Sequence, residues 1–495
     1  MRGTYRFVPI LALLMVLGGI GLSIPLPTWA QEATPAAEGA TLAAEGAAPA
    51  AEAAPAAEAA APESTAPGPT PPALNNGDQA WMLASSALVL LMTPGLAFFY
   101  GGLVRRKNVL SVLMQCFFCM CIVTVLWVVV GFSIAFGSDK AGGLFGNPFD
   151  YFMLKGITTT EPWEPMPKVW WPISEQVFMI FQCMFAIITP GLIVGAFAER
   201  MKISSFVLFL VAWVLLVYCP VAHWVWYGSL GIGAFGETDA VPIGALDFAG
   251  GTVVHINAGI AALICCLLLG KRADVPKGGV APHNLPFAVL GAGLLWFGWF
   301  GFNAGSAGGA TPQAVQAFVV TQVAAAAAGL VWVLIEWFVH ARPTMLGMIT
   351  GVVAGLVAIT PAAGFVEVGP ALIIGGVASV ICYFFVAAVK PMVGYDDALD
   401  VFGVHGIGGV WGAIATGIFA VPGFGVDRAG GLMYGNSAQL FIQIKAVLVT
   451  AIYSAVVTAV ILLVIKVLLG LRTTEEGERL GLDITDHALP AYNEA

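Results

Sequence analysis

Residues 108–137 read NVLSVLMQCFFCMCIVTVLWVVVGFSIAFG, a run of thirty residues without a charged side chain, directly after Arg105, Arg106 and Lys107. A helix of about 20 apolar residues is long enough to cross the hydrocarbon core of a bilayer. Core helices of soluble proteins are shorter and carry a polar face. The stretch therefore predicts a membrane-spanning helix.

The same pattern recurs along the whole chain, which is 59% hydrophobic and 10% charged, with a mean hydropathy of +0.89. Short segments rich in Gly, Pro and charge separate the apolar runs, as expected between transmembrane helices. We predict an all-α integral membrane protein with eleven transmembrane helices. The expected spans are residues 80–103, 108–137, 174–198, 204–226, 247–270, 285–303, 311–340, 345–362, 369–390, 398–420 and a long eleventh helix over 438–470.

Basic residues are distributed unequally between the two sets of connecting loops. One set holds twelve: Arg105, Arg106, Lys107, Arg200, Lys202, Lys271, Arg272, Lys277, Arg342, Lys390, Arg472 and Arg479. The other set holds four: Lys140, Lys155, Lys168 and Arg428. Because cytoplasmic loops carry the excess of Lys and Arg, this bias predicts an outside N-terminus and a cytoplasmic C-terminus.

The N-terminal region differs in composition from the rest. Arg2 and Arg6 precede an apolar run and a small-residue ending at Ala30, which predicts a signal peptide over residues 1–30. An uncleaved signal anchor is the alternative. Residues 31–78 are largely Ala, Pro, Glu and Gly and predict a disordered linker. The membrane domain is then expected over 79–471, followed by a cytoplasmic tail over 472–495.

The eight cysteines all lie in predicted spans, where they are expected to pack. Cys116, Cys119 and Cys121 form a cluster, but no nearby His or carboxylate completes a metal site. We therefore expect no metal and no cofactor. The net charge of −9 gives no basis for a nucleic-acid partner.

An internal repeat links the fifth and tenth spans. Asp247 is followed eight residues later by His255, and Asp397 is followed eight residues later by His405. Spans five apart run in opposite directions, so spans 1–5 and 6–10 are predicted to form an inverted repeat, which brings span five beside span ten.

His255 and His405 are the deepest ionisable residues of the predicted spans. A charged side chain at the centre of a membrane helix costs about 2.5–3.5 kcal/mol, so such residues suggest function. Small residues follow both histidines, which favours close helix packing and a shared interior. Two hydrogen-bonded core histidines are the structural alternative. A metal pair is disfavoured because no Cys or carboxylate accompanies them at ligand spacing.

Three aspartates lie near the start of these two spans. Asp397 and Asp400 are expected to cap helix N-termini. For Asp247 we favour a role in ordering the vestibule over direct attraction of a cation. Trp226 and the aromatic and serine residues around 181–185 and 299–306 could bind a small cation, although interfacial packing also explains membrane aromatics.

Four strings carry a resemblance to a known family: DFAGGTVVHIN (247–257), GWFGFNAGS (298–306), GLIVGAFAER (191–200) and DVFGVHG (400–406). Over about residues 79–485 the chain resembles the Amt branch of the Amt/Rh ammonium transporter family. The resemblance implies a homotrimer, with one narrow pore in each protomer. It implies that the protein is not an enzyme. The signal peptide and the outside N-terminus predict a location in the inner (plasma) membrane.

The resemblance also assigns residues by their motif positions. Trp226, Phe181, Phe185 and Ser306 match an outer site that recruits ammonium, and Phe185 and Phe302 match a stacked gate below it. His255 and His405 match the twin histidines of the pore, and Asp247 matches a vestibule residue with a structural or deprotonating role. The implied mechanism is capture of ammonium, deprotonation, and passage of ammonia with a relayed proton. The sequence does not decide between electrogenic transport and ammonia-only flux.

The tail over 472–495 resembles a cytoplasmic terminus that couples protomers and contributes to the surface bound by a PII-type signalling protein. It departs from the family pattern after His487, where Ala488 and Leu489 stand in place of Gly and Glu. A solvated acidic tail is the alternative. The other histidines, His223, His283, His340 and His487, receive no role.

Three other functions remain to be compared with transport. An ammonium sensor that passes little substrate is the main alternative; no kinase-like or cyclase-like segment is recognisable after residue 471. An intramembrane enzyme lacks a recognisable nucleophile beside either histidine. The neighbouring Rh branch is less similar around Trp226 and Ser306.

Overall fold

The computed structural model describes residues 71–166, 169–227, 244–273, 275, 280–423 and 430–492, without the side chains of residues 165, 166, 169 and 170. The predicted signal peptide and the linker as far as residue 70 lie outside the described residues. Lys168, Lys277 and Arg428, which contribute to the charge bias, also lie outside them. The first described helix begins at Asn76, three residues before the expected start of the membrane domain.

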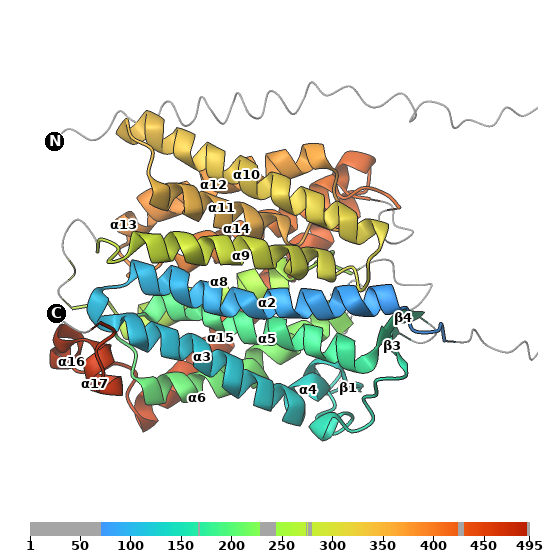
Figure 1. The fold of residues 1–495 in the computed structure, drawn as a ribbon, viewed down its shortest axis with the longest axis horizontal. Helices are drawn as coiled ribbons and strands as arrows, with labels where there is room; N and C mark the ends of the chain where they lie inside the picture. Colours follow the sequence, from blue (N-terminus) through green and yellow to red (C-terminus); the bar gives the residue numbers. More distant parts are fainter. Residues whose placement is uncertain are drawn as a thin grey trace, which may run out of the picture. The chain divides into compact units, whose positions relative to one another are not determined.

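Eleven apolar helical segments make up the described part of the membrane domain (Figure 1). The first six are α2 (Asn76–Leu103), α3 to α4 (Arg106–Phe136), α5 (Glu175–Phe197), α6 to η6 (Ile203–Tyr227), η8 with α8 (Gly251–Leu269) and α9 (Leu285–Gly305). The last five are α10 (Pro312–His340), α11 (Met345–Ile359), α12 to α13 (Val368–Val393), η10 with α14 (Phe402–Phe419) and α15 (Ser437–Leu468).

The prediction of an eleven-span all-α protein is confirmed, with one short member. Ten of the described segments are long and apolar enough to cross a membrane, and the eleventh, α11, has 15 residues. The helix was expected to continue to residue 362, but Pro361 follows its end. A proline disfavours helical geometry in the residue before it and removes one backbone donor, which explains the early end.

Several of these segments contain a π-helical turn. Span two comprises α3 (Val109–Leu126), η3 (Trp127–Gly131) and α4 (Phe132–Phe136). Span four comprises α6 (Ile203–Trp213), η5 (Val214–Tyr218), α7 (Cys219–Ala222) and η6 (His223–Tyr227). Span nine comprises α12 (Val368–Phe384), η9 (Phe385–Val389) and α13 (Lys390–Val393). Such π-turns inside helices occur frequently at functional sites.

Spans one and six pack closely because glycines line their contact. A Cβ atom at Gly102 of α2 would lie 2.5 Å from the backbone N of Ala288, and one at Gly291 of α9 would lie 2.2 Å from that of Phe99. Spans five and ten approach in the same way, since a Cβ at Gly259 would lie 2.2 Å from Gly406 N. The pairing of span one with six and of five with ten is the arrangement that the predicted inverted repeat produces.

The two ends of the helices carry different structures (Figure 1). At one end, which we call the hairpin face, lie β1 (Asp139–Lys140) with β2 (Phe145–Gly146) and β3 (Pro162–Met166) with β4 (Val169–Ser174), two antiparallel pairs that the sequence analysis did not predict. In the second pair Pro162 is opposite Ser174 and Trp163 is opposite Trp171. At the other end, the C-terminal face, lie α16 (Glu475–Leu480) and α17 (Leu482–His487).

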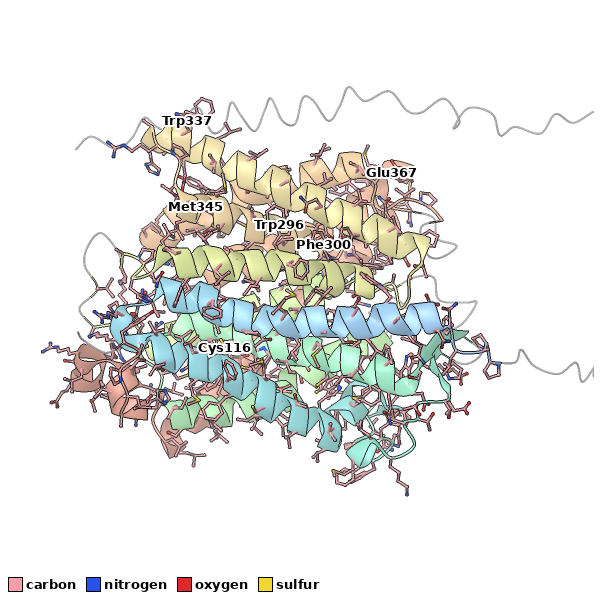
Figure 2. The ribbon with its side chains drawn as sticks, in the orientation of Figure 1. Cys116, Trp296, Phe300, Trp337, Met345 and Glu367 are labelled. Carbon is pink, nitrogen blue, oxygen red and sulfur yellow. The ribbon has the colours of Figure 1, made fainter. Side chains whose placement is uncertain are left out.

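The helices differ in how much of their side-chain surface is buried: α5 is central and α3, α10 and α15 are peripheral. Nearly every residue of α5 is buried, whereas α3, α10 and α15 expose large apolar side chains such as Phe117, Trp337 and Val467. Figure 2 shows Trp337 directed away from the helices. Exposed apolar surface of this extent is compatible with lipid rather than water. The eight cysteines are free thiols within these helices, and Cys121 is the one among them that is exposed.

Candidate functional site: a twin-histidine passage with an aromatic cap

The structure brings His255 and His405 together inside the bundle. His255 lies in η8 (Gly251–Ile256) and His405 in η10 (Phe402–Gly406). Their Nδ1 atoms are 3.3 Å apart, and the rings lie 5.3 Å apart between centroids, with an angle of 23° between planes. The side chains are buried, with 1% and 5% exposure. A contact between two Nδ1 atoms requires one ring to donate and the other to accept, so the pair shares one proton.

The glycines beside the histidines make this contact geometrically accessible. The backbones of Gly259 and Gly406 lie closer than a side chain would allow, so spans five and ten meet directly behind the two imidazoles. The other nitrogen of His255, Nε2, is buried and has no hydrogen-bond partner among the described residues. This nitrogen is therefore available for a polar guest.

Two aspartates cap the π-helical turns that carry the histidines. Asp247 Oδ2 accepts hydrogen bonds from the N–H groups of Thr252 at 3.0 Å and Val253 at 3.1 Å, and Oδ1 accepts one from Gly250. Asp397 Oδ2 accepts one from Phe402 N at 2.8 Å. Each carboxylate thus reaches the fifth residue after it, and each histidine stands eight residues after its aspartate. The two halves of the chain therefore cap the histidine-bearing turn in the same way, with an aspartate that accepts backbone hydrogen bonds.

The expected capping role of Asp400 was wrong. Its carboxylate binds Lys390 Nζ at 2.6 Å instead. Asp397 already occupies the helix start, and the backbone of Asp400 turns through a left-handed conformation with φ of 61°. The side chain is therefore displaced from the helix start and available for the lysine of α13.

An aromatic cap, which we define as Phe181, Phe185, Trp226, Phe302 and Ser306, lies on the hairpin-face side of the histidines. The rings of Phe185 and Phe302 are 4.3 Å apart, and Phe302 lies 6.0 Å from the ring of His255. Phe185 also contacts Trp226 edge to face at 5.5 Å and Phe181 at 5.0 Å. The three phenylalanines are buried, whereas Trp226 and Ser306 are half-buried.

Local hydrogen bonds fix the polar groups of this cap. Ser306 directly follows the last residue of α9, and its Oγ donates to Phe302 O at 2.8 Å, which leaves the oxygen lone pairs available. Trp226 Nε1 donates to the backbone oxygen of Asp247 at 3.1 Å. Asp247 therefore holds the start of the histidine turn through its carboxylate and the cap tryptophan through its carbonyl. Its side-chain oxygens are occupied by backbone N–H groups.

The space between the cap and the histidines is narrow and apolar. A cavity of about 10 Å³ is lined there by apolar side chains, including Leu96, Ile188 and Val353, and by the two histidines. That volume is at the lower limit for a single water-sized guest. Beyond His405, a wider cavity of about 480 Å³ extends among charged residues of the C-terminal face, including Arg272, Lys390 and Asp396.

Trp299 packs against the histidine pair, whereas the sequence analysis placed it only among the aromatic residues over 299–306 that could bind a small cation. Its indole stacks on His255 at 5.5 Å with an angle of 20° between planes, and its Nε1 donates to Thr360 Oγ1 at 2.9 Å. Trp299 and Phe302 are three residues apart in α9, and that spacing places both on one face of a helix. This spacing in the sequence could have predicted that Trp299 lies beside Phe302 on the same face of α9.

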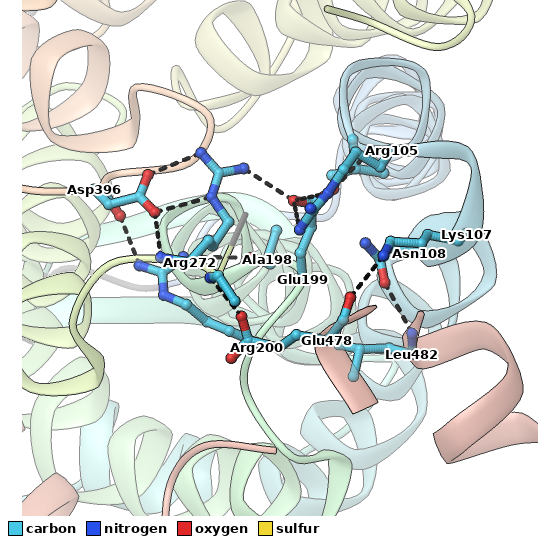
Figure 3. A network of polar contacts seen from close by, with 12 residues as sticks. Arg105, Lys107, Asn108, Ala198, Glu199, Arg200, Arg272, Asp396, Glu478 and Leu482 are labelled. Carbon is cyan, nitrogen blue, oxygen red and sulfur yellow. Dashed lines mark hydrogen bonds and ion pairs between the residues drawn. The ribbon is translucent and has the colours of Figure 1, made fainter. Parts of the chain in front are cut away.

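An ion-pair network crosses the C-terminal face (Figure 3). Buried Glu199, with φ of 73°, binds Arg105 and Arg272, and Arg272 also makes a bidentate contact with Asp396. Burial alone would raise the carboxyl pKa values, but the arginines outweigh it. They hold the pKa of Glu199 below its ordinary value and lower that of Asp396 to about 2.

The tail is bound to this face rather than solvated. Glu478 accepts a hydrogen bond from Ala273 N at 2.8 Å and pairs with Arg472, while Lys107 donates to the Glu478 carbonyl. In addition, Asn108 Oδ1 accepts from Leu482 N and Asp483 Oδ1 accepts from Ser111 N. These contacts, several of which appear in Figure 3, exclude the freely solvated tail as a description of the residues up to 492.

The fold defines a multi-pass membrane protein, in which the buried histidine pair lines both the narrow apolar cavity and, through His405, the wider cavity of the C-terminal face. Comparison with known proteins specifies the class further. The chain is 51% identical over 421 residues to an ammonium transporter of Aquifex aeolicus, covering 85% of this chain and 94% of that protein. It is 47% identical over 421 residues to an ammonium transporter of Bacillus subtilis, covering 85% and 99%.

The structure is also similar to the crystal structure of Candida albicans Mep2, with a TM-score of 0.73, 36% identity, and coverage of 81% of this chain and 87% of that one. The sequence model of the Ammonium Transporter Family matches residues 80–492 of this chain. The chain belongs to this family.

Proposed function

We propose that the protein moves ammonium across the plasma membrane by separating it into ammonia and a proton at the entrance of the passage. The observation that carries this proposal is the 3.3 Å contact between His255 and His405 within a narrow apolar space. A bare cation in such a space is strongly disfavoured, whereas neutral ammonia is not. Hydrogen-bonded imidazoles exchange protons near neutral pH, so the pair can relay the proton that ammonia leaves behind.

Recruitment occurs at the aromatic cap in this proposal. The faces of Trp226, Phe181 and Phe185 attract a small cation by about 0.5–2 kcal/mol each, depending on desolvation. Ser306 Oγ accepts a hydrogen bond from ammonium. The Phe185 and Phe302 rings close the route below that site and open as the guest passes. Potassium has the charge but no proton to release, so it is retained outside the apolar space.

Asp247 acts indirectly in this mechanism. Its two carboxylate oxygens already accept three backbone hydrogen bonds, and its carbonyl holds Trp226. The residue therefore orders the vestibule and the start of the His255 turn. This supports the structural role over direct attraction of the cation.

The hairpin face is outside and the C-terminal face is cytoplasmic in this proposal, as the distribution of basic residues indicates. Protomers assemble as a homotrimer, and a PII-type signalling protein binds the cytoplasmic face. The ordered tail between residues 472 and 492 supports a defined docking surface there. Light scattering of the detergent-solubilised protein measures the number of copies.

The test is the charge displaced by reconstituted protein on a solid-supported membrane after an ammonium concentration jump. We expect a current in the wild type that disappears, or becomes sensitive to potassium, in the His255→Ala, His405→Ala double variant. Loss of the proton relay removes the charge that accompanies ammonia. A wild type that binds ammonium tightly without current would favour the sensor.

A further inference from the structure

The segment that follows α9 is held by two elements from elsewhere in the chain. Residues 306–310 include Ser306 of the aromatic cap and Gly308, whose φ is 73°. Trp171 of β4 lies directly on Gly308, since a Cβ atom there would be 2.5 Å from the indole Cε3. Asp78, in the first turn of α2, accepts a hydrogen bond from Ala310 N at 2.8 Å.

The hairpin and the start of α2 are also bonded to each other. Asn75 N donates to Pro172 O at 2.9 Å, and Gln79 Oε1 accepts hydrogen bonds from Ser174 N and Oγ at 3.1 and 3.2 Å. Residues 75–79, 171–174 and 306–310 therefore form one connected unit, which we call the outer clamp. Because its three segments come from distant parts of the sequence, the position of each depends on the other two.

The same hairpin contacts the helix that supplies two residues of the cap. Trp163 stacks on Phe178 of α5 at 4.3 Å, and Trp171 meets the same ring edge to face at 5.6 Å. Phe178 precedes Phe181 by three residues, so both lie on one side of α5. Phe181 in turn lies against Gly305, where a Cβ would be 2.8 Å from its ring. The hairpin thus contacts α5, which carries Phe181, and the segment that follows Ser306.

We infer that Trp171 and Asp78 are positioning residues for ammonium recruitment, acting through Ser306. This rests on the function proposed above. Ser306 Oγ donates to Phe302 O at the end of α9, and the backbone of Ser306 continues directly into the segment that reaches Ala310. Packing of Trp171 on Gly308 and the bond from Ala310 to Asp78 fix that backbone. The outer clamp therefore sets the apparent affinity for ammonium and its preference over the larger methylammonium ion.

The experiment measures half-saturating concentrations of ammonium and methylammonium from transport currents of reconstituted full-length protein. Trp171→Ala and Asp78→Ala should each raise the ammonium value about threefold to tenfold, the cost of a misplaced hydrogen-bond acceptor, with the saturating current retained. Trp171→Phe should recover most of the affinity. Trp163→Phe, which changes the same hairpin without touching residues 306–310, is the matched control and should stay near wild type.

Double variants separate action through Ser306 from a general effect. In a Ser306→Ala background, Trp171→Ala should add little further change, because the group that it positions is absent. Additive losses in that background would overturn the inference. So would a normal affinity of Trp171→Ala while Ser306→Ala and Trp226→Leu bind ammonium weakly, and the proposed function would then stand.

Failure of the proposed function gives a different result. If Ser306→Ala and Trp226→Leu both keep wild-type affinity, the recruitment site itself is wrong and the positioning role falls with it. Thermal unfolding in detergent identifies variants that do not fold. If Trp171→Ala is among them, Trp171→Phe and Asp78→Ala carry the comparison, and unchanged affinity in Asp78→Ala would overturn the inference.

Discussion

Trp299 contacts His255 with the face of its ring and Thr360 with its indole N–H group. Its indole covers one face of His255, and its N–H group is buried with Thr360 Oγ1 as acceptor. Thr360 Oγ1 itself donates to Leu356 O at 2.7 Å. The threonine therefore serves as donor and acceptor at once. A buried donor that loses its acceptor keeps its full desolvation cost, so this bond matters more than its net strength suggests.

Thr360→Val should lower the stability of the protein by about 1–3 kcal/mol, because it leaves the indole N–H of Trp299 without an acceptor. Thermal unfolding in detergent measures this as a lower melting temperature. Thr350→Val is the control, since Thr350 Oγ1 donates to Leu346 O in α11 and accepts no hydrogen bond from another side chain of the described residues. Equal melting temperatures for the two variants would contradict the assignment.

At the level of whole helices, the contact between α2 and α9 depends on a glycine that allows the two backbones to approach closely. Gly291 and Gly293 lie in the same helix, but their surroundings differ completely. A Cβ at Gly291 would lie within 2.2 Å of Phe99 N, whereas one at Gly293 would meet nothing within 4 Å. Close backbone approach is a principal source of helix affinity in membranes, where water provides no hydrophobic drive between helices.

Gly291→Ala should therefore separate spans one and six, reduce the yield of folded protein and lower its melting temperature. Gly293→Ala should be neutral or stabilising by about 0.5–1 kcal/mol, since alanine is the better helix former. Size-exclusion chromatography and thermal unfolding report both effects. A tolerated Gly291→Ala would show that the α2–α9 contact is less tight than described.

The end of α17 offers a second test at this scale. Ala488 adopts a left-handed conformation, with φ of 55° and ψ of 25°, at a position where helices commonly use glycine. Ala488→Gly should relieve about 1 kcal/mol of strain and slow hydrogen exchange over residues 482–488. Ala341→Gly, which relieves φ of 59° at the end of α10, should leave tail exchange unchanged. Faster tail exchange in Ala488→Gly would refute the prediction.

The whole molecule depends on the C-terminal face to join its parts. Glu199, Arg272 and Asp396 connect the loops after spans three and five to the segment before span ten, and Ala273 connects the same loop to Glu478 of the tail. Because Asp396 has a pKa of about 2, well below the ordinary value near 3.9, it stabilises the folded state above pH 4. That contribution disappears as the pH falls through its folded-state pKa.

Melting temperatures of the wild type and Asp396→Asn should therefore differ at pH 6 and converge as the pH falls from 4 towards 2. At pH 6 the free energies of unfolding should differ by on the order of 2 kcal/mol, because Arg272 stabilises the ionised Asp396 carboxylate in the folded state and not in the unfolded state. Glu199 titrates in the same direction. A difference that persists unchanged at pH 2 would exclude the Arg272–Asp396 pair as its source.

The length of the apolar runs was sufficient to predict the eleven spans. In lipid, each helix satisfies its own backbone hydrogen bonds, so a span needs only enough consecutive apolar residues. The runs located the ends of the described spans within four residues, and α11 ends three residues early, at Ile359, before Pro361. The Asp and His spacing correctly indicated a repeat, and motif strings supplied the cap residues. The β3–β4 hairpin was not predicted because its strands, PWEPM and VWWPIS, contain prolines and do not alternate regularly between polar and apolar residues.

The sequence by itself therefore determined the class of protein, the number of spans and which histidines and aromatics to examine. Only the tertiary structure decided that the two Nδ1 atoms are 3.3 Å apart, that Asp400 binds Lys390 and that Trp299 covers His255. It also decided that the tail is bound to the C-terminal face. The physical reason is that hydropathy depends on each residue alone, whereas these contacts depend on how the helices and the segments between them pack against one another.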